Sequence, residues 1–234
     1  MSLFNDIEVE VLDLVEDKVG GGGFAKFDKT GFYDVVIEKA YAGVSDGGAY
    51  NVNLTLKRED GAKLNVIEYI SSGTAKGCKN YYLDKDGNKQ YLPGYNKIKN
   101  LDALLGFDRA YPKTAKGNVM LWDRDLKKEL PVEKEVISEW INKKIGILVT
   151  KKLEDKYGSE TEYREVFEVE HFLRDGRTRN EIIAGSSGFL NKWLTTKDES
   201  YILDKREQSK NKPYPPVAES NNTSSDAIPD DAPF

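Results

Sequence analysis

The chain offers few side chains that could act as a nucleophile or as a general acid or base. It contains one histidine, His171, and one cysteine, Cys78, which excludes a cysteine zinc cluster and argues against a multi-histidine metal site. His171 falls in an alternating stretch typical of a structural sheet residue, and no second histidine is present to activate Cys78. The sequence therefore predicts neither catalysis nor a cofactor.

Three carboxylates come closest to a metal-binding pattern. Asp123 and Asp125 are spaced as Asp-x-Asp, with Glu129 nearby. In a charged loop this spacing is typical of solvated surface, so we expect no bound metal. A magnesium-dependent nuclease using these carboxylates is a distant alternative.

Tyrosines and lysines are interleaved in the middle of the chain, where residues 63–99 carry a net charge of +4. Flat rings stack on nucleobases and lysines follow a phosphate backbone, so this mixture is typical of proteins that bind single strands without reading sequence. Some of these tyrosines could equally be core residues. The candidate binding residues are Lys57, Tyr69, Lys76, Lys79, Tyr81, Tyr82, Tyr91, Tyr95, Lys97, Arg109, Tyr111, Lys113 and Trp122.

The net charge of −5 is unevenly distributed along the chain. Residues 1–17 hold six acidic and no basic side chains, and residues 219–234 hold four acidic and no basic ones. Residues 18–218 consequently carry +5. A basic centre between two acidic ends suits a polyanionic partner, although ordinary surface charge would also give it.

Hydrophobic periodicity predicts two groups of strands with helices between and after them. Alternating or β-branched stretches predict strands at 32–41, 50–57, 63–71, 145–155 and 163–175, and a small hairpin around Asp86-Gly87. Helical spacing predicts helices at 96–107, between Asn96 as cap and Gly106 as stop, and at 132–144. Residues 108–131 have no clear period. A capping box, Thr178-x-x-Glu181, predicts a short helix, and another is expected near 188–200.

This order of elements predicts a mainly β fold. Three strands, an insertion with a helix, two strands and a trailing helix is the order of an OB-fold, a five-stranded barrel. We expect residues 1–23 to be an acidic leading segment with a glycine joint at 20–23, and the alternation in its first half is compatible with one strand. Residues 24–204 would form the OB-like domain with a large insertion, and residues 205–234 a disordered acidic tail. Another α+β topology stays open.

Nothing in the sequence indicates a membrane protein. No apolar run approaches 18 residues, and the first residues carry acids where a secretory signal would carry bases. We expect a cytoplasmic protein that does not associate with a membrane.

The last nine residues, DAIPDDAPF, combine acids with an aromatic end. They resemble the C-terminal tip of bacterial single-stranded DNA-binding proteins, which end in acids followed by Ile-Pro-Phe; here the end is Ala-Pro-Phe. Residues 31–61 also resemble the first strands of small phage OB-fold proteins. The resemblance implies that the tip docks on a partner through Asp226, Asp230, Asp231, Pro233 and Phe234.

Together these features predict a phage-type protein that coats single-stranded DNA without sequence preference, in the cytoplasm of a host cell. The tail would recruit replication or recombination proteins. The main alternative is an adaptor that binds proteins but has no groove for DNA, since an acidic tail suits it equally well.

Overall fold

A computed structural model of the chain describes residues 26–155 and 163–206, and it is mainly β with short helices. The strands are β1 (Gly31–Val44), β2 (Tyr50–Lys57), β3 (Lys63–Tyr69), β4 (Tyr81–Leu83), β5 (Lys89–Tyr91), β6 (Ala115–Asp123), β7 (Lys128–Val136), β8 (Lys144–Asp155), β9 (Tyr163–Phe172) and β10 (Ile202–Asp204). The α-helices are α1 (Pro93–Leu104), α2 (Arg179–Ala184) and α3 (Phe189–Thr196). Two single 3₁₀ turns are η1 (Thr74–Lys76) and η2 (Ser138–Trp140).

The main sheet follows the predicted strands closely. β1, β2 and β3 form an antiparallel meander, and β8 pairs antiparallel with β1 on one edge and with β9 on the other. The resulting order is β3-β2-β1-β8-β9, with the short β10 running parallel beside the end of β8. The predicted strands at 32–41, 50–57, 63–71, 145–155 and 163–175 are all confirmed.

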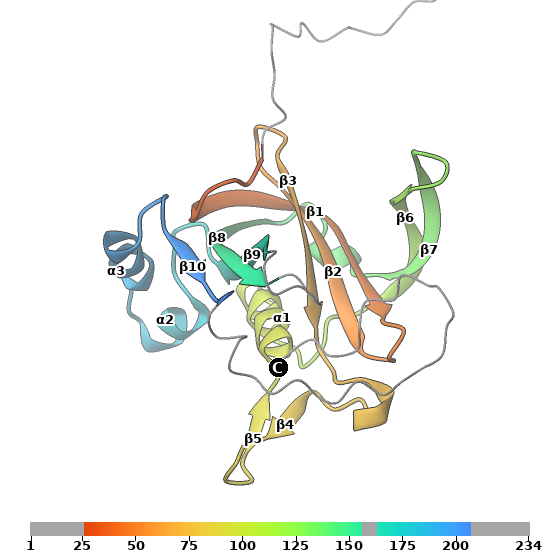
Figure 1. The fold of residues 1–234 in the computed structure, drawn as a ribbon, viewed down its shortest axis with the longest axis horizontal. Coiled ribbons are helices and arrows are strands. Elements are labelled where there is room, and N and C mark those ends of the chain that lie inside the picture. The colour runs from red at the N-terminus through yellow and green to blue at the C-terminus, as the bar shows by residue number, and fades with distance from the viewer. Residues whose placement is uncertain (1–25, 156–162, 207–234) are drawn as a thin grey trace, which may run out of the picture.

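The sheet does not close into the barrel that we expected. No strand pairing joins β3 to β9 in the described part of the chain. Helix α1 instead contacts both strands, and Figure 1 shows it near the ends of β8 and β9. The fold is therefore an open, curved antiparallel sheet with a helix at its seam.

One main core fills the inner face of this sheet. It joins alternate residues of β1, β2, β8 and β9 to α1 and to Trp140 of η2, which is fully buried. A smaller cluster forms elsewhere, where Leu148 and Phe172 meet Leu190 of α3. The alternation that predicted the strands thus reflects burial of one face.

The insertion between β3 and β8 contains two hairpins. The β4–β5 hairpin is the one predicted around Asp86-Gly87, and it leads directly into α1. The second hairpin, β6–β7, stands out from the sheet (Figure 1) and is joined to β1 by a short ladder at its base.

The helix predicted at 132–144 is wrong. Residues 128–136 form β7, which pairs along its length with β6, so 115–123 is also not irregular as expected. Val132, Lys134 and Val136 follow one another at every second residue, which is the period of a strand. The apolar residues Ile137 and Trp140 belong to the η2 turn. The apolar residues at helical spacing therefore come from two different elements.

The remaining helices agree with the sequence. The predicted helix at 96–107 is α1, although it begins at Pro93 rather than at the expected cap, Asn96. The capping box is present: the Thr178 hydroxyl accepts from the Glu181 amide and the Glu181 carboxylate accepts from the Thr178 amide. Among residues 26–155 and 163–206 no helix is long and apolar enough to cross a membrane.

Several predictions fall outside the described residues. These are the possible strand and the glycine joint in residues 1–23, and the acidic tail beyond residue 206 with its tip residues.

Candidate nucleic-acid interface

The outer face of the meander carries three rows of side chains, set by strand register. Lys39 of β1 stands beside Thr55 of β2 and Asn65 of β3, and the next row is Tyr41, Asn53 and Ile67. The third row is Gly43, Asn51 and Tyr69. Side chains directly opposite in a sheet lie on one face, so these rows form one continuous surface.

This surface is mostly neutral and polar. The Thr55 hydroxyl donates to the Asn65 side chain at 2.9 Å, and the Asn53 amide donates to Asn51 at 2.7 Å. A Cβ on Gly43 would lie 2.7 Å from the Asn51 side-chain oxygen, so glycine keeps this row flat. The face can therefore offer hydrogen bonds and the Tyr69 ring without a strong charge of its own.

The β4–β5 hairpin supplies exposed aromatic rings near the end of β3, since Gly94, shortly after β5, lies against the Tyr69 backbone. Tyr81 lies opposite Tyr91 in the ladder, and Tyr82 and Tyr91 are both exposed. The ammonium groups of Lys89 and Lys79 lie 4.7 Å and 6.0 Å from the centroid of the Tyr81 ring. Cations held near aromatic rings suit a ligand that is both flat and anionic.

Three tyrosine rings in a row, Tyr91, Tyr95 and Tyr111, connect the hairpin to α1 and to the loop after it. The Tyr95 ring lies 5.3 Å from that of Tyr91 and 5.5 Å from that of Tyr111, measured between centroids. Tyr95, on α1, is buried, whereas Tyr91 and Tyr111 are exposed. Tyr95 therefore acts as a support that fixes the other two rings.

A pocket of about 300 Å³ opens beside the same hairpin. Its lining residues are Ser72, Lys76, Lys79, Tyr81, Tyr82, Leu83 and Leu92. The Ser72 hydroxyl accepts from the backbone amide of Lys79 at 2.9 Å, which holds the loop after β3 against the start of β4. The pocket thus combines apolar walls with lysines. Such a lining suits a ligand that carries both an uncharged ring and an anionic group.

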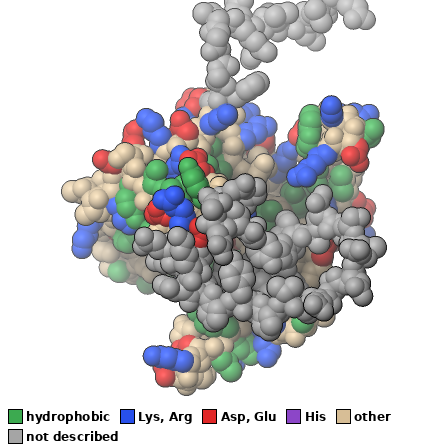
Figure 2. Space-filling view, in the orientation of Figure 1, with side chains coloured by type: hydrophobic (Ala, Val, Ile, Leu, Met, Phe, Trp, Pro, Cys, Tyr) green, Lys and Arg blue, Asp and Glu red, His purple; other side chains and the backbone are tan. Residues whose placement is uncertain are grey.

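The β6–β7 hairpin presents a further exposed aromatic side chain. Trp122 is 62% exposed, with Met120 and Leu126 also exposed. The Lys39 ammonium donates to the Met120 carbonyl oxygen and, at 2.9 Å, to the Glu129 carboxylate, so this arm is tied to β1. Figure 2 shows apolar and basic side chains together on this arm and on the β4–β5 hairpin.

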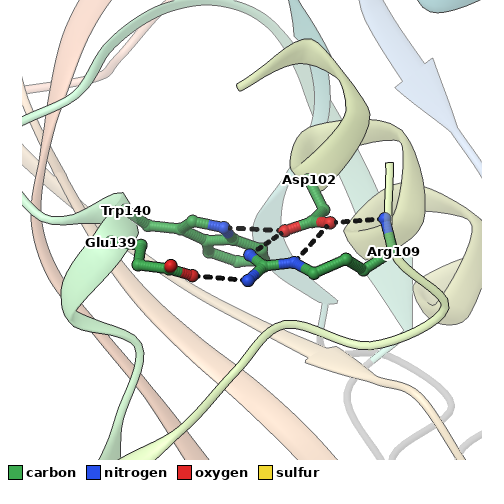
Figure 3. A network of polar contacts seen from close by, with 4 residues as sticks. All are labelled: Asp102, Arg109, Glu139 and Trp140. Carbon is green, nitrogen blue, oxygen red and sulfur yellow. Dashed lines mark hydrogen bonds and ion pairs between the residues drawn. The ribbon is translucent and has the colours of Figure 1, made fainter. Parts of the chain in front are cut away.

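Arg109 occupies a different environment from the one predicted. Its guanidinium hydrogen-bonds to both carboxylate oxygens of Asp102, at 2.7 and 3.2 Å, and to Glu139 (Figure 3). Asp102 is fully buried and also accepts from the Trp140 indole at 3.1 Å. Burial alone would raise the pKa of Asp102, but the hydrogen bonds from Arg109 and Trp140 outweigh it and hold that pKa below its usual value. The network joins α1 to η2 inside the fold.

Lys97 is also turned inward. Its ammonium lies 3.3 Å from Glu68 of β3 and 3.9 and 3.6 Å from Glu168 and Glu170 of β9, and its side chain is 13% exposed. Burial raises the pKa of Glu68 and of Glu170 despite this cation. Lys97 thus bridges the open seam of the sheet where no backbone ladder does.

The side chains that could have served in catalysis or metal binding, His171, Asp123 and Glu129, are buried or bonded within the fold. His171 is buried with neither ring nitrogen hydrogen-bonded, and burial together with Lys97 lowers its pKa to about 3. Asp123 accepts from the amides of its own turn, while Glu129 pairs with Lys39. In residues 26–155 and 163–206, no three His, Cys, Asp or Glu side chains are grouped so as to hold a metal ion.

The predicted binding residues therefore separate into groups. The structure gathers most of them around the end of β3 and the β4–β5 hairpin: Tyr69, Lys76, Lys79, Tyr81, Tyr82, Tyr91 and Tyr111. Trp122 lies on the other hairpin and Lys113 precedes it, while Lys57 ends β2 at the far side of the meander. Tyr95 is buried, and the mostly covered side chains of Lys97 and Arg109 are held by carboxylates of the fold.

Two residues of the outer face were missed. Lys39 and Tyr41 fall in a predicted strand, but the register shifts between Ile37 and Lys39, which marks a bulge. A bulge reverses the alternation of faces, so a simple two-residue period assigns these side chains wrongly.

Comparison with known proteins adds no family assignment. No protein-family model matches the chain, and no curated protein matches its sequence.

Proposed function

We propose that this protein binds single-stranded DNA without sequence preference. The observation that carries the proposal is the group of hairpin tyrosines near the end of β3, one of which, Tyr81, has two lysines at its ring, beside a polar sheet face that carries Tyr69. Single-strand binders use such rings to stack on bases and cations to follow the phosphates. Lysines at a ring, rather than at a carboxylate, favour a phosphate-bearing ligand here.

The strand order supports the same proposal. β3-β2-β1-β8-β9, with α1 between β3 and β8 in sequence, is the order of an OB-fold, which we propose is present here in an open form. OB-folds bind oligonucleotides on the face of their second and third strands, and Tyr69 lies on that face.

The acidic tail is proposed to serve in recruitment. Phe234 would fill a pocket on a replication or recombination protein, with Asp230 and Asp231 steering the encounter, as in the bacterial proteins that the tip resembles. Such a protein would act in the cytoplasm of a host cell if it is encoded by a phage. No catalytic step or cofactor is part of the proposal.

Titration with a thymidine oligonucleotide tests DNA binding. We expect Trp122 and tyrosine emission to be quenched, and affinity to fall with salt at a log–log slope of about −0.7 per phosphate neutralised. A duplex of equal length should bind more weakly at each salt concentration. Equal affinity for the two forms would contradict single-strand binding, and no affinity for either would favour the adaptor.

Tail variants test recruitment separately. Removing residues 226–234 should leave oligonucleotide affinity unchanged or higher, since a tethered anion is lost, and should abolish capture of partners. Phe234→Ala should abolish capture alone, because it removes the aromatic anchor but keeps the charges. Partner capture that survives Phe234→Ala would contradict the docking role.

A further inference from the structure

Strand β3 has one edge without a backbone partner. The Ile70 amide donates to the Tyr50 carbonyl at 2.9 Å, and in an antiparallel ladder alternate residues bond to the same neighbour. The backbone N–H and C=O groups of Lys63, Asn65 and Ile67 therefore point away from β2. No strand in the described ranges pairs with this edge, and an unpaired edge is a template for another strand.

The edge is open over only part of its length. Leu64 and Val66 face the main core yet stay half-buried, and Ile67 on the other face is 56% exposed. Towards the end of β3 the edge is blocked, because a Cβ on Gly94 of α1 would lie 2.3 Å from the Tyr69 carbonyl oxygen. The free stretch is therefore 63–67, flanked by apolar side chains that an added strand would cover.

The chain itself supplies a segment that ends beside this stretch. The described chain begins at Lys26, whose carbonyl oxygen lies 3.5 Å from the Arg58 guanidinium, at the turn into β3. Phe27 is buried beneath the same guanidinium, 5.4 Å from its ring centroid. Residues 12–25 can span up to about 46 Å when extended, more than the roughly 24 Å length of β3.

The pattern of residues 7–11, IEVEV, suits this position. Ile7, Val9 and Val11 alternate with acids, as in a strand with one apolar and one charged face. The apolar face would continue the surface of Leu64 and Val66. The acidic face would lie beside Lys63. Residues 1–17 as a whole hold six acids and no base, so this end of the chain is attracted to a lysine.

We propose that residues 7–11 add to the free edge of β3 as an antiparallel strand of the same molecule. In the register that fits both faces, Glu10 lies opposite Lys63, the end of β3 nearest to Lys26, while Val9 and Ile7 lie opposite Leu64 and Val66. The added strand would place Glu8 and Glu10 at the margin of the outer face. These carboxylates would then compete with DNA for the same surface. The competition rests on the proposed function, but the docking of the strand does not.

Hydrogen exchange without DNA tests the docking. The amides of Lys63, Asn65 and Ile67 should exchange at least about tenfold more slowly in the full chain than in a chain lacking residues 1–19, since only the full chain would pair them. Val9→Pro together with Glu10→Pro removes an N–H from each edge of the segment, so it should abolish the protection. Asp17→Pro with Lys18→Pro, outside the alternating stretch, is the matched control and should keep it.

Two results would overturn the proposal. One is equal exchange at these amides in the full and shortened chains. The other is protection that rises with protein concentration, which would assign the edge to a strand from a second copy. Oligonucleotide affinity is measured in a separate experiment, so a chain that shows the protection but binds no DNA would contradict only the proposed function.

Discussion

The cations inside the fold and those on the β4–β5 hairpin differ in what they face. Arg109 and Lys97 are surrounded by carboxylates, which fixes each side chain and cancels its charge. Lys89 and Lys79 are exposed and lie near the Tyr81 ring instead. A carboxylate partner makes a cation part of the scaffold, whereas an aromatic partner leaves it available to a phosphate.

The scaffold side of this comparison predicts the largest effect. Asp102→Ala should lower the free energy of unfolding by about 3–5 kcal/mol, because it leaves the Arg109 charge and the Trp140 indole without their buried acceptor. Urea denaturation measures the loss. Asp86→Ala, at an exposed turn, is the control and should change stability by less than about 0.5 kcal/mol. Similar small losses in both variants would show that the network is not structural.

Much of the fold could be predicted because burial leaves a pattern in the sequence of the main strands. β2 and β3 alternate between their two faces, and residues 145–149 of β8 form a continuous apolar run that is buried on both faces. The turn at Asp86-Gly87 and the Thr178–Glu181 capping box are local signals. The β6–β7 hairpin could not be found in this way. Most of its side chains on both faces are at least partly exposed, so its sequence lacks the contrast between faces.

The candidate site could be predicted only by composition. Tyrosines and lysines marked the region, but Tyr91 and Tyr95 are four residues apart and differ completely in burial. Likewise Arg109 and Lys113 look equivalent until the fold brings Asp102 and Glu139 to Arg109. Such partners are distant in sequence, so no local pattern reveals them.

The hairpin side of the comparison predicts an effect on binding rather than on stability. Tyr91→Ala should weaken oligonucleotide binding by about 1–3 kcal/mol, since an exposed stacking ring is removed. Fluorescence titration measures the loss. Tyr163→Ala, on β9, removes an equally exposed tyrosine from another strand and should leave affinity unchanged. Equal affinities for the parent and the Tyr91 variant would place the site elsewhere.

The free energy of unfolding should fall at acid pH because His171 is buried without a hydrogen-bond partner near Lys97. The folded protein keeps His171 neutral down to a pKa of about 3, whereas in the unfolded chain it takes up a proton below about 6.5. The unfolded state therefore binds more protons between these values, and stability falls as pH is lowered. Between pH 7.5 and 5 this should cost about 2 kcal/mol.

His171→Leu removes this titration and fills the buried position with an apolar side chain. Its unfolding free energy should lose about 2 kcal/mol less than that of the parent over the same pH range. Because His171 is the only histidine, no other imidazole confuses the comparison. Parallel stability–pH curves for the two proteins would show that the ring is solvated or paired in the folded state.

The smallest effect separates the two kinds of lysine directly. Lys89→Ala should weaken binding modestly and make the log–log salt slope shallower by about 0.7, because one fewer phosphate is neutralised. Lys192→Ala, an exposed lysine on α3, is the control and should keep the slope of the parent. Lys97→Met should also keep that slope, because its charge faces Glu68 rather than a ligand, and it should lower stability instead. A shallower slope for Lys97→Met in a folded protein would mean that the inward lysine reaches DNA, and the division between scaffold and surface cations would then fail.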